Sequence, residues 1–282
     1  MRSYIEELCH AKRHASALGA FNVFNGLSVR AVIAAATELD TPVILQTSVP
    51  TVRQFGVERL GAMLKLMTRD APVHVMIHLD HCRDIELAKA CVDAGWNSVM
   101  YDGSMLPLEE NIANCRIIAS YAHAKGVQVE GELGHIAGTE DSLSVAEADA
   151  ADADLDASIR LVRESGIDSL APAIGTVHGT YRGEPHINFP LVEQLAAALD
   201  IPLVIHGGTG LSEAVFARLI QNGAAKVNVA TALRHAYFSG IQAYLSDNPG
   251  QEDPAALDQF LSSRIQAAAA EHMRIFQAAA LP

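Results

Sequence analysis

Aromatic residues, lysines and closely spaced cysteines are all scarce in this sequence. Only 5% of the 282 residues are aromatic while 50% are hydrophobic, so the core must consist mainly of aliphatic side chains. That balance is typical of an α/β protein in which Ala-rich helices cover a buried sheet. The four cysteines form no CxxC pair, and a chain of this length does not need disulfide bonds to fold. We therefore expect unpaired thiols and a reducing, cytoplasmic compartment.

An excess of basic charge, an apolar leader and long hydrophobic runs are also missing. The formal net charge of −13 argues against nucleic acid or an anionic membrane as the main partner. An anionic metabolite is still compatible, because a metal ion or an arginine can reverse the field inside a cleft. Charges are spread over residues 1–15, which excludes a typical signal peptide, and no apolar run approaches the length of a membrane span. We expect a soluble protein that binds neither nucleic acid nor membrane.

Eight short apolar runs recur along the chain, and amphipathic helical patterns separate them. The runs are almost continuously hydrophobic, as strands of a parallel sheet are when both faces are buried. The stretches between them begin near Ser or Asp, and two end at Gly, which matches the chemistry of helix caps. The runs cover residues 19–24, 42–46, 73–79, 97–101, 127–133, 168–174, 202–206 and 225–230.

Eight βα units in a chain of this length predict an α/β fold of the TIM (β/α)8 barrel type, with residues 1–282 forming a single domain. A helix within residues 2–15 would precede the barrel. Helices at 231–246 and 254–278 would extend its last helical layer. A doubly wound sheet is the alternative, but no GxGxxG motif follows the first strand.

One segment interrupts this rhythm. Residues 134–154 are polar and acidic and contain two glycines. Long irregular loops in compact domains are usually lids or disordered stretches, and both are open here. Because the segment follows a strand end, where barrel enzymes carry out their chemistry, we interpret it as a mobile active-site loop.

Polar side chains follow every predicted strand. The run "VHVMIHLDHC" ends in Asp80 and His81, and burying either group without a partner would be costly. A shared cleft at the C-terminal ends of the strands explains this placement, because catalytic groups of TIM barrels lie on that face. The residues at the eight strand ends are Asn22, Gln46, Ser48, Asp80, His81, Asp102, Glu132, His178, His206, Asn228 and Thr231.

Three of these residues are histidines: His81, His178 and His206. Three imidazoles with an open fourth position describe a catalytic zinc site. A single histidine at a strand end is more often structural, and no HExxH motif is present, but three at one barrel mouth favour a metal. Asp80 then either orients a histidine or acts as general acid and base. The remaining acidic candidates are Asp102 and Glu132, for a second cation or for support of the site, and Glu140 in the loop, which could swing over a substrate.

Two glycine-containing segments flank the later histidines. His178 lies in "AIGTVHGTY" and His206 in "VIHGGTG". Glycines let backbone amides approach an anion closely, and "HGGTG" is expected to open a helix whose N-terminus could hold a phosphate. An ordinary βα turn would use the same residue types. A lysine that forms a Schiff base with a carbonyl substrate is not expected at the mouth. Four of the five lysines lie in helical segments, and Lys226 begins the eighth strand, at the other end of the barrel.

Eight motifs, in order, resemble those of the class II (zinc-dependent) ketose-bisphosphate aldolases, the fructose- and tagatose-bisphosphate aldolase family. The resemblance extends from about residue 4 to about residue 246 and rests on "AFNVFN", "HLDHC", "SVMYDGS", "EGELG", "GTEDSLSV", "AIGTVHGTY", "IHGGTG" and "KVNVAT". It implies a retro-aldol TIM-barrel enzyme that forms homodimers or homotetramers. The family's zinc ligands match the three histidines, and its acidic residues near an alternative metal position match Asp102 and Glu132. Asp80 matches the residue that shuttles the proton on the C4 oxygen, and Glu140 the one that takes or returns the C3 proton.

The resemblance also implies a phosphate site, which a monovalent cation (Na⁺ or K⁺) often supports. The family's phosphate-binding amides match Gly179, Gly207, Thr209 and the turn from Asn228 to Thr231, with Ser48 nearby; Gly208 and Ala230 complete these segments. Asn228 also matches a residue that contacts substrate hydroxyls. Three departures concern the bisphosphate specificity: Arg182 stands where many relatives have lysine, Ala232 replaces an acidic residue, and only Arg264 approximates an arginine that binds the distal phosphate across a subunit contact.

The predicted function is the reversible aldol cleavage of a ketose (bis)phosphate to dihydroxyacetone phosphate and an aldehyde, through a zinc-stabilised enediolate. The first alternative is a class II aldolase for a ketose monophosphate or another aldehyde, as the altered distal arginine suggests. A metal-dependent hydrolase barrel is a further alternative, although such barrels usually begin with HxH where this chain has "AFNVFN". The last is a non-catalytic partner subunit.

Overall fold

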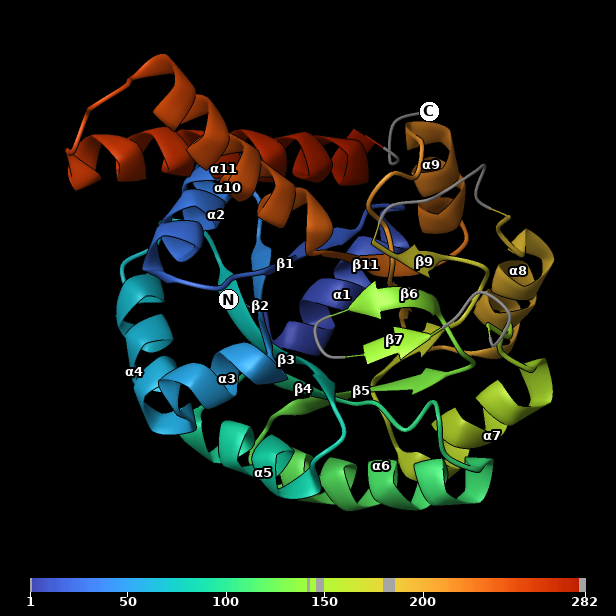
Figure 1. The fold of residues 1–282 in the computed structure, drawn as a ribbon. Coiled ribbons are helices and arrows are strands. Elements are labelled where there is room, and N and C mark those ends of the chain that lie inside the picture. Colours follow the sequence, from blue (N-terminus) through green and yellow to red (C-terminus); the bar gives the residue numbers. More distant parts are fainter. Residues whose placement is uncertain (1, 141–142, 146–149, 180–185, 279–282) are drawn as a thin grey trace.

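Eight parallel strands form a closed barrel, which Figure 1 shows in cross-section. The computed structural model describes residues 2–140, 143–145, 150–179 and 186–278. Around the barrel the strand order is β1-β11-β10-β8-β5-β4-β3-β2. Their bounds are β1 (Leu18–Asn22), β2 (Val43–Ser48), β3 (Val75–Cys82), β4 (Ser98–Tyr101), β5 (Gln128–Leu133), β8 (Ser169–Pro172), β10 (Leu203–Ile205) and β11 (Ala224–Val229).

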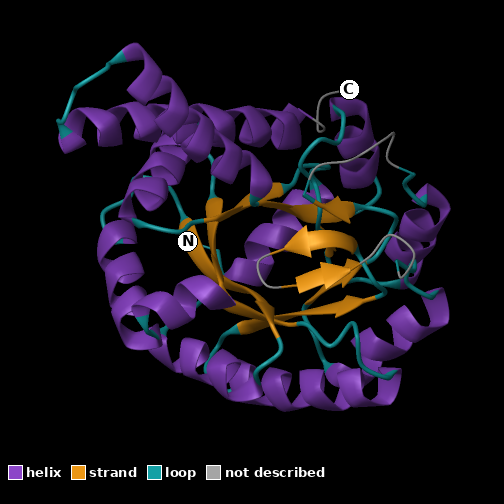
Figure 2. Ribbon diagram, in the orientation of Figure 1, coloured by secondary structure: helices purple, strands orange, loops and turns teal. Residues whose placement is uncertain are grey.

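Each barrel strand corresponds to one of the eight apolar runs, so the TIM barrel is confirmed and the doubly wound sheet is wrong. Neighbouring strands pair in parallel all round the ring; Ser48, for example, pairs with Asp80 and Phe21 with Val229. Most strand residues are fully buried, because the barrel interior covers one face and the helices cover the other. Figure 2 shows this division, with strands inside and helices outside.

The outer layer consists of helices that follow the strands in turn. Several begin at a residue whose side chain caps the first turn, such as Asn25, Asp84 and Ser212. The helices are α2 (Gly26–Glu38), α3 (Val49–Phe55), α4 (Val57–Thr68), α5 (Ile85–Ala94), α6 (Leu108–His123), α7 (Leu155–Ser165), α8 (Phe189–Ala198), α9 (Glu213–Gln221), α10 (Thr231–Asp247) and α11 (Pro254–Ala278). The last two confirm the predicted C-terminal helices, and α11 packs against α2, α9 and α10.

The N-terminal helix α1 (Tyr4–Arg13) covers the N-terminal end of the barrel. A capping box between Ser3 and Glu6 starts it. Its buried face, which includes Tyr4 and Leu8, packs on residues from the beginnings of the strands, among them Leu18, Ala20, Ile44, Met76 and Ala225. This confirms the predicted extra helix and leaves the opposite end of the barrel as the mouth.

The segment after β5 is more regular than expected from its sequence. Strands β6 (Ala137–Glu140) and β7 (Leu143–Val145) form an antiparallel hairpin, and β9 (Val177–His178) pairs with β6 in parallel. This small sheet lies over the mouth in Figure 1. The described part of residues 134–154 is therefore partly β-structure, which is too short to produce a clear alternating pattern. The mobility of this segment stays a prediction. Within the described ranges, no helix is long and apolar enough to span a membrane.

Candidate functional site at the barrel mouth

A local irregularity at the end of β3 brings Asp80 and His81 into the same cluster. Neighbouring strand residues normally point to opposite faces. Here the pairing of β3 with β4 shifts register between Leu79 and Cys82, and His81 has a φ of 42°. Such a backbone conformation costs a non-glycine residue about 1–3 kcal/mol and is concentrated at functional sites. This irregular backbone at the end of β3 explains how the adjacent residues Asp80 and His81 both face the mouth.

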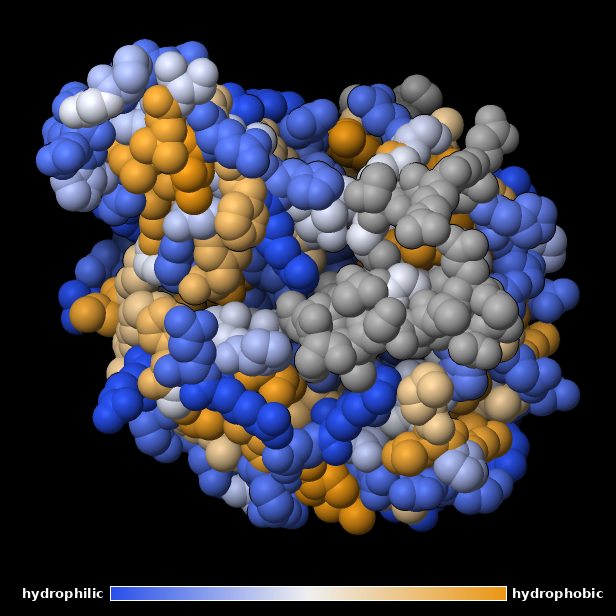
Figure 3. Space-filling view, in the orientation of Figure 1, coloured by the Kyte–Doolittle hydropathy of each residue, from blue (hydrophilic) through white to orange (hydrophobic). Residues whose placement is uncertain are grey.

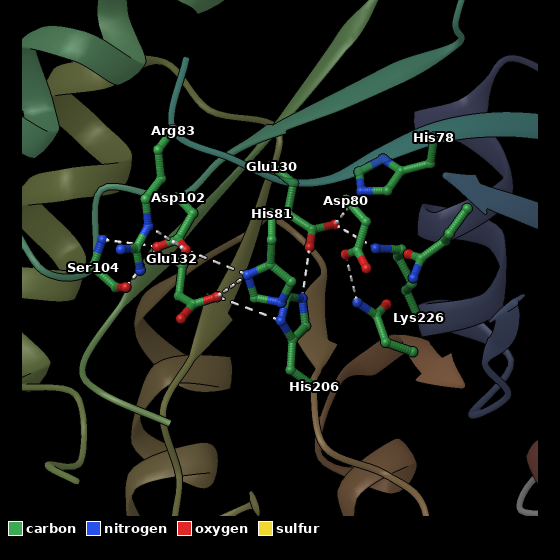
Figure 4. A network of polar contacts seen from close by, with 12 residues as sticks. His78, Asp80, His81, Arg83, Asp102, Ser104, Glu130, Glu132, His206 and Lys226 are labelled. Carbon is green, nitrogen blue, oxygen red and sulfur yellow. Dashed lines mark hydrogen bonds and ion pairs between the residues drawn. The ribbon is translucent and has the colours of Figure 1, made fainter. Parts of the chain in front are cut away.

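Two imidazole rings meet at the centre of the mouth (Figure 4). The ring centroids of His81 and His206 lie 4.7 Å apart in an edge-to-face arrangement. Glu132 Oε2 lies 3.6 Å from His81 Nδ1 and 3.4 Å from His206 Nδ1, so one carboxylate oxygen faces both rings. Burial lowers the pKa of His206, although its hydrogen bond with a carboxylate opposes this shift. The His206 ring is therefore neutral near pH 7, as a metal ligand must be.

Asp102 supports His81 from the side. One carboxylate oxygen, Oδ2, lies 3.4 Å from His81 Nδ1 and accepts a hydrogen bond from Arg83 Nε at 3.0 Å. The other oxygen accepts from Ser104 Oγ at 2.6 Å. Burial alone would raise the pKa of Asp102, but His81, Ser104 and Arg83 together hold it well below its usual range. Asp102 thus provides a fixed negative charge beside the two rings.

Asp80 is held by two amide side chains from other strands. Its Oδ2 accepts a hydrogen bond from Asn22 Nδ2 at 2.8 Å, and its Oδ1 accepts from Asn228 Nδ2 at 3.2 Å. Asn22 in turn accepts from Gln46 Nε2 at 2.9 Å. This network brings together four of the predicted strand-end residues and fixes the plane of the Asp80 carboxylate, whose exposed fraction is only 1%.

Glu130 and Lys226 lie one step deeper in the barrel and were not predicted as part of the site. Lys226 is the third residue of β11 and fully buried, so the expectation that it begins the strand, away from the site, is wrong. Its Nζ donates to Glu130 Oε2 at 2.8 Å, and Glu130 Oε1 lies 2.9 Å from His206 Nε2. Burial would raise the pKa of Glu130, but Lys226 and the neighbouring histidines hold it far below its usual range. The sequence did contain a signal, since the glutamates of "EGE" alternate along one strand and face the same side.

The donor atoms at the mouth fit a divalent metal ion. In the described part of the chain, two sets of residues bring their possible ligand atoms within 4.8 Å of one another: Asp80 with His81 and His206, and His81 with Asp102 and Glu132. Imidazole nitrogens and carboxylate oxygens are the usual ligands of zinc and related metals. The two sets share His81, so they describe two adjoining positions in one cluster.

His178 and Glu140 are placed by their backbones, as the last residues of β9 and β6. Gly207, next to His206, brings β9 close: a Cβ at this glycine would lie 2.6 Å from the carbonyl oxygen of Val177. The backbone of His178 is therefore near that of His206, and Gly138 of the hairpin pairs with it. Arg182 lies outside the described residues.

The loops after β10 and β11 lie side by side because the two strands pair. Contrary to expectation, "HGGTG" does not open a helix: Thr209 and Gly210 form a turn, and α9 begins only at Glu213, where Ser212 caps it. At α10, however, the N-cap residue is Ala230, and no side chain caps the first turn. The free amides of such a turn favour an anion. The loops after the seventh and eighth strands are also where many TIM barrels bind phosphate.

A cavity of about 330 Å³ lies next to the hydrogen-bond network of Asp80, because Asn22 belongs to both. Its lining includes Asn22, which hydrogen-bonds Asp80, and Ser48, which caps α3. The sequence had singled out Ser48, but it missed Arg234, which brings a positive charge to this cavity from the first turn of α10. Thr51, Gln54 and Phe238 also line it. Arg264, considered from the sequence, lies near Phe260, with its guanidinium 5.8 Å from the ring centre, and its role across a subunit contact stays a prediction.

A closed parallel barrel whose mouth gathers buried carboxylates and imidazoles defines a TIM-barrel enzyme with a candidate metal centre. The sequence profile described as "Fructose-bisphosphate aldolase class-II" matches residues 2–280. The chain therefore belongs to the class II fructose-bisphosphate aldolase family, which is generally metal-dependent, and it is an aldolase, a lyase that breaks and forms carbon–carbon bonds.

Similar proteins agree with this family and differ in their named substrates. The chain is 40% identical over 255 residues to a "Fructose-bisphosphate aldolase" of Geobacillus stearothermophilus, covering 88% of this chain and 87% of that one. It is 36% identical over 242 residues to a "Sulfofructosephosphate aldolase" of Alkalicoccus urumqiensis, covering 86% and 84%. The crystal structure of the YdjI aldolase from Escherichia coli K12 superposes with a TM-score of 0.86 at 31% identity, covering 98% and 97%. The resemblance inferred from eight motifs is confirmed.

Proposed function

We propose that the enzyme uses one Zn²⁺ per subunit to cleave a ketose phosphate reversibly into dihydroxyacetone phosphate and an aldehyde. The observation that carries the proposal is the convergence of His81, His206 and Asp80 next to two loops suited to phosphate. We assign the zinc to His81, His178 and His206, with Asp102 and Glu132 at the adjoining position. Bound there, the metal supplies a Lewis acid for the negative charge that develops on the ketone oxygen. The neutral state of His206 and the nearby backbone of β9 support this ligand set.

Asp80 is the group that moves the proton on the C4 oxygen of the ketose. Its carboxylate lies beside the imidazoles, yet two amide donors hold it, so it can keep its position while a proton comes and goes. Asn228, which contacts Asp80, is also placed to meet a substrate hydroxyl. A general acid and base must lie within hydrogen-bond reach of the proton that it transfers. The cavity beside Asp80 provides space for the cleaved part of the sugar in that position.

The β6–β7 hairpin carries Glu140 to the mouth side of the barrel, where we assign it the C3 proton. Residues 134–154 would then act as a mobile cover that brings Glu140 over the substrate and excludes water. The support is topological: β6 leaves the end of β5, and β9 joins it to the segment that carries His178. The barrel, this hairpin and the C-terminal helices thus act as one functional domain.

The phosphate of dihydroxyacetone phosphate is assigned to the backbone of Gly179, Gly207, Gly208 and Thr209 and to the N-terminus of α10 at Asn228, Ala230 and Thr231. Arg182 is the additional polar candidate at this end, Ser48 is a substrate-binding candidate in the cavity that it shares with Arg234, and Na⁺ or K⁺ could balance the phosphate charge. The uncapped start of α10 and the pairing of β10 with β11 support this location. The N–H groups of an uncapped helix start favour an anion, which is the reason for placing the phosphate here.

The distal end of the substrate is assigned to the cavity that Arg234 lines, which favours an aldehyde with its own anionic group. Fructose or tagatose bisphosphate is therefore the first choice, and a ketose monophosphate is the alternative. The names of the two relatives fit a negative charge at this end, since one specifies a second phosphate and the other a sulfo group. A panel of ketose bisphosphates, a sulfoketose phosphate and a ketose monophosphate, assayed for dihydroxyacetone phosphate with and without a chelator, tests the function.

Arg234→Ala is expected to raise KM for an anionic-tailed substrate by about 10–100-fold, because a hydrogen bond to a charged group contributes about 1.5–3 kcal/mol. KM for a ketose monophosphate should change little. Arg69→Ala, which removes an exposed arginine at the end of α4, is the control and should leave KM for both substrates unchanged. Equal losses on both substrates with Arg234→Ala would contradict the assignment of the distal end.

The substrate panel tests the zinc aldolase itself. Cleavage of no ketose phosphate, or full activity in chelator, would contradict it, and hydrolysis of a substrate that has no ketone would favour a hydrolase.

A homodimer or larger oligomer is proposed through the exposed apolar face of α10. Phe238 and Leu245 are 63% and 56% exposed, and Ile241 lies between them at helical spacing. Figure 3 shows an apolar area over the α10–α11 region at the upper left. Such clustered apolar side chains often mark protein interfaces. Because Phe238 also lines the cavity beside Asp80, a second copy of the chain docked here would help enclose the substrate.

The double variant Phe238→Glu with Leu245→Glu is expected to shift the protein toward monomer, because two charges would face the apolar partner surface. Light scattering coupled to gel filtration measures the mass. Leu66→Glu is a suitable control, since Leu66 is 64% exposed on α4, away from α10. A monomeric wild-type protein, or an unchanged mass in the double variant, would rule out this interface.

We also place the enzyme in the cytoplasm, where its four unpaired cysteines would stay reduced.

A further inference from the structure

Glu130, Lys226 and His206 form a chain of contacts inside the barrel, beneath the proposed metal centre. Glu130 lies in the middle of β5 and Lys226 in β11, and neither side chain has any exposed surface. The two carboxylate oxygens have different partners: Oε2 accepts from Lys226 Nζ at 2.8 Å, and Oε1 lies 2.9 Å from His206 Nε2. Figure 4 shows Glu130 in the middle, joined by dashed lines to Lys226 and to His206.

Stability alone does not account for a buried ion pair at this position. Removing two charges from water is costly, and replacing such a pair by apolar side chains of similar volume is often neutral or stabilising. Apolar side chains are accommodated in the same interior, since Ala20, Ile44 and Met76 are fully buried against α1. The pair is therefore better explained by what it contacts, which is one ring nitrogen of His206.

The contact fixes which nitrogen of His206 faces the mouth. A neutral imidazole has one N–H, and a carboxylate that accepts from Nε2 keeps that hydrogen there. The lone pair is then on Nδ1, the atom that lies 3.4 Å from Glu132 Oε2 and faces the ring of His81. Outer carboxylates commonly orient metal-binding histidines in this way. Lys226 holds the second oxygen of Glu130 and balances its charge, so Oε1 stays directed at Nε2.

We propose that Glu130 is a positioning residue that sets the tautomer and ring orientation of His206 for metal binding, and that Lys226 anchors Glu130. The inference rests on the proposed zinc function, because it gives His206 the role of a ligand. His78 closes the site from below: its Nε2 lies 3.9 Å from Glu130 Oε2, and its Nδ1 lies 3.0 Å from Ser98 Oγ. Tyr4 of α1 stacks on the His78 ring, which keeps water from the pair.

Two double variants isolate the hydrogen bond to His206. Glu130→Met with Lys226→Met removes both charges and leaves no acceptor for Nε2. Glu130→Gln with Lys226→Met removes the same charges but keeps an oxygen that can accept from it. Both pairs keep side chains of similar length. Because each pair removes both charges, neither leaves an unpaired buried charge. Glu7→Gln is the control, because Glu7 contacts His74 Nδ1 at 3.1 Å at the other end of the barrel.

The measurement is the dissociation constant for Zn²⁺, obtained by competition with a chelator, together with the visible spectrum of the Co²⁺-loaded protein and the Tm of the metal-free protein. We expect the Met/Met variant to bind metal about 10–100-fold more weakly, with an altered Co²⁺ spectrum. Its metal-free Tm should be close to that of the wild type. The Gln/Met variant should recover most of the affinity, and the control should match the wild type.

The outcomes separate the two levels of the proposal. If the wild type binds no divalent ion, the zinc function fails, and the positioning role fails with it. If the wild type binds zinc and the Met/Met variant binds it equally well, the proposed function stands and the role of Glu130 is overturned. Equal weakening in the Met/Met and Gln/Met variants would also overturn it, because the acceptor oxygen would then make no difference.

Discussion

Asp80→Ala is expected to lower kcat by about 10²–10⁴-fold, the range of general acid–base catalysis, while the protein keeps its metal. Two amide side chains, those of Asn22 and Asn228, hold this carboxylate by one oxygen each. Alanine is preferable to asparagine, because an asparagine amide would direct N–H groups at one of these N–H donors. Steady-state cleavage assays and elemental analysis of the purified variant measure the two quantities.

The result distinguishes two roles that the geometry allows for Asp80. Its carboxylate belongs to a possible ligand set with His81 and His206, so it could bind the metal directly. Loss of metal in Asp80→Ala would show that it is a ligand, and retained activity would require another proton acceptor. Asp200→Ala, at an exposed position, controls for the loss of a carboxylate and should change neither quantity.

The barrel and the end of it that bears the site could be predicted from the sequence because both depend on local patterns. Continuous apolar runs mark strands buried on both faces, and a polar residue after each run marks the mouth. Asn22, Asp80 and Asn228 come from three strands that are far apart in the sequence, yet both asparagines hydrogen-bond Asp80 at the strand ends. In a closed barrel the C-terminal ends of all eight strands surround one mouth, so residues that follow successive strands in the sequence come close together.

The missing parts depend on contacts that no local pattern encodes. Glu130 and Lys226 are mid-strand residues, and their pairing requires knowing which faces of β5 and β11 point inward. The register of the strands supplies this, and period-two pairs such as Glu130 with Glu132 are the only trace in the sequence. Arg234 was missed because it lies in a helix, where an arginine is normally solvated; only the start of α10 next to β11 brings it to the cavity.

The strained backbone of His81, near the end of β3, is a third feature that the sequence does not reveal. A regular β3 would point Asp80 and His81 to opposite faces, so the motif "HLDHC" alone predicts two polar residues but not one cluster. The register shift against β4 and the positive φ of His81 resolve this conflict. Conformational strain of this kind persists where the surrounding contacts determine it, and here Asp102 and Glu132 both lie close to the displaced ring.

His206→Ala is expected to remove both metal and activity. Loss of an outer partner of a ligand typically weakens metal binding by about 10–100-fold, so loss of the ligand itself should reach at least the upper end of that range. The substitution also leaves Glu130 Oε1 without its ring contact, inside a barrel that water does not reach. The stability of the metal-free protein should therefore fall as well. Zinc affinity by chelator competition, kcat and Tm measure the three effects.

A matched variant separates the ligand role from a general effect of losing a histidine. His272→Ala removes an imidazole from α11, where its Nδ1 contacts a carbonyl of the same helix, and it should leave zinc affinity and kcat unchanged. Asp80→Ala is expected to differ from His206→Ala in one respect, since it loses catalysis but keeps the metal. If His206→Ala bound zinc as tightly as the wild type, the metal could not lie between the two rings. The mouth would then have to be interpreted as a hydrogen-bonded cluster of His81, Asp102 and Glu132, with His206 serving only to fill the space above Glu130.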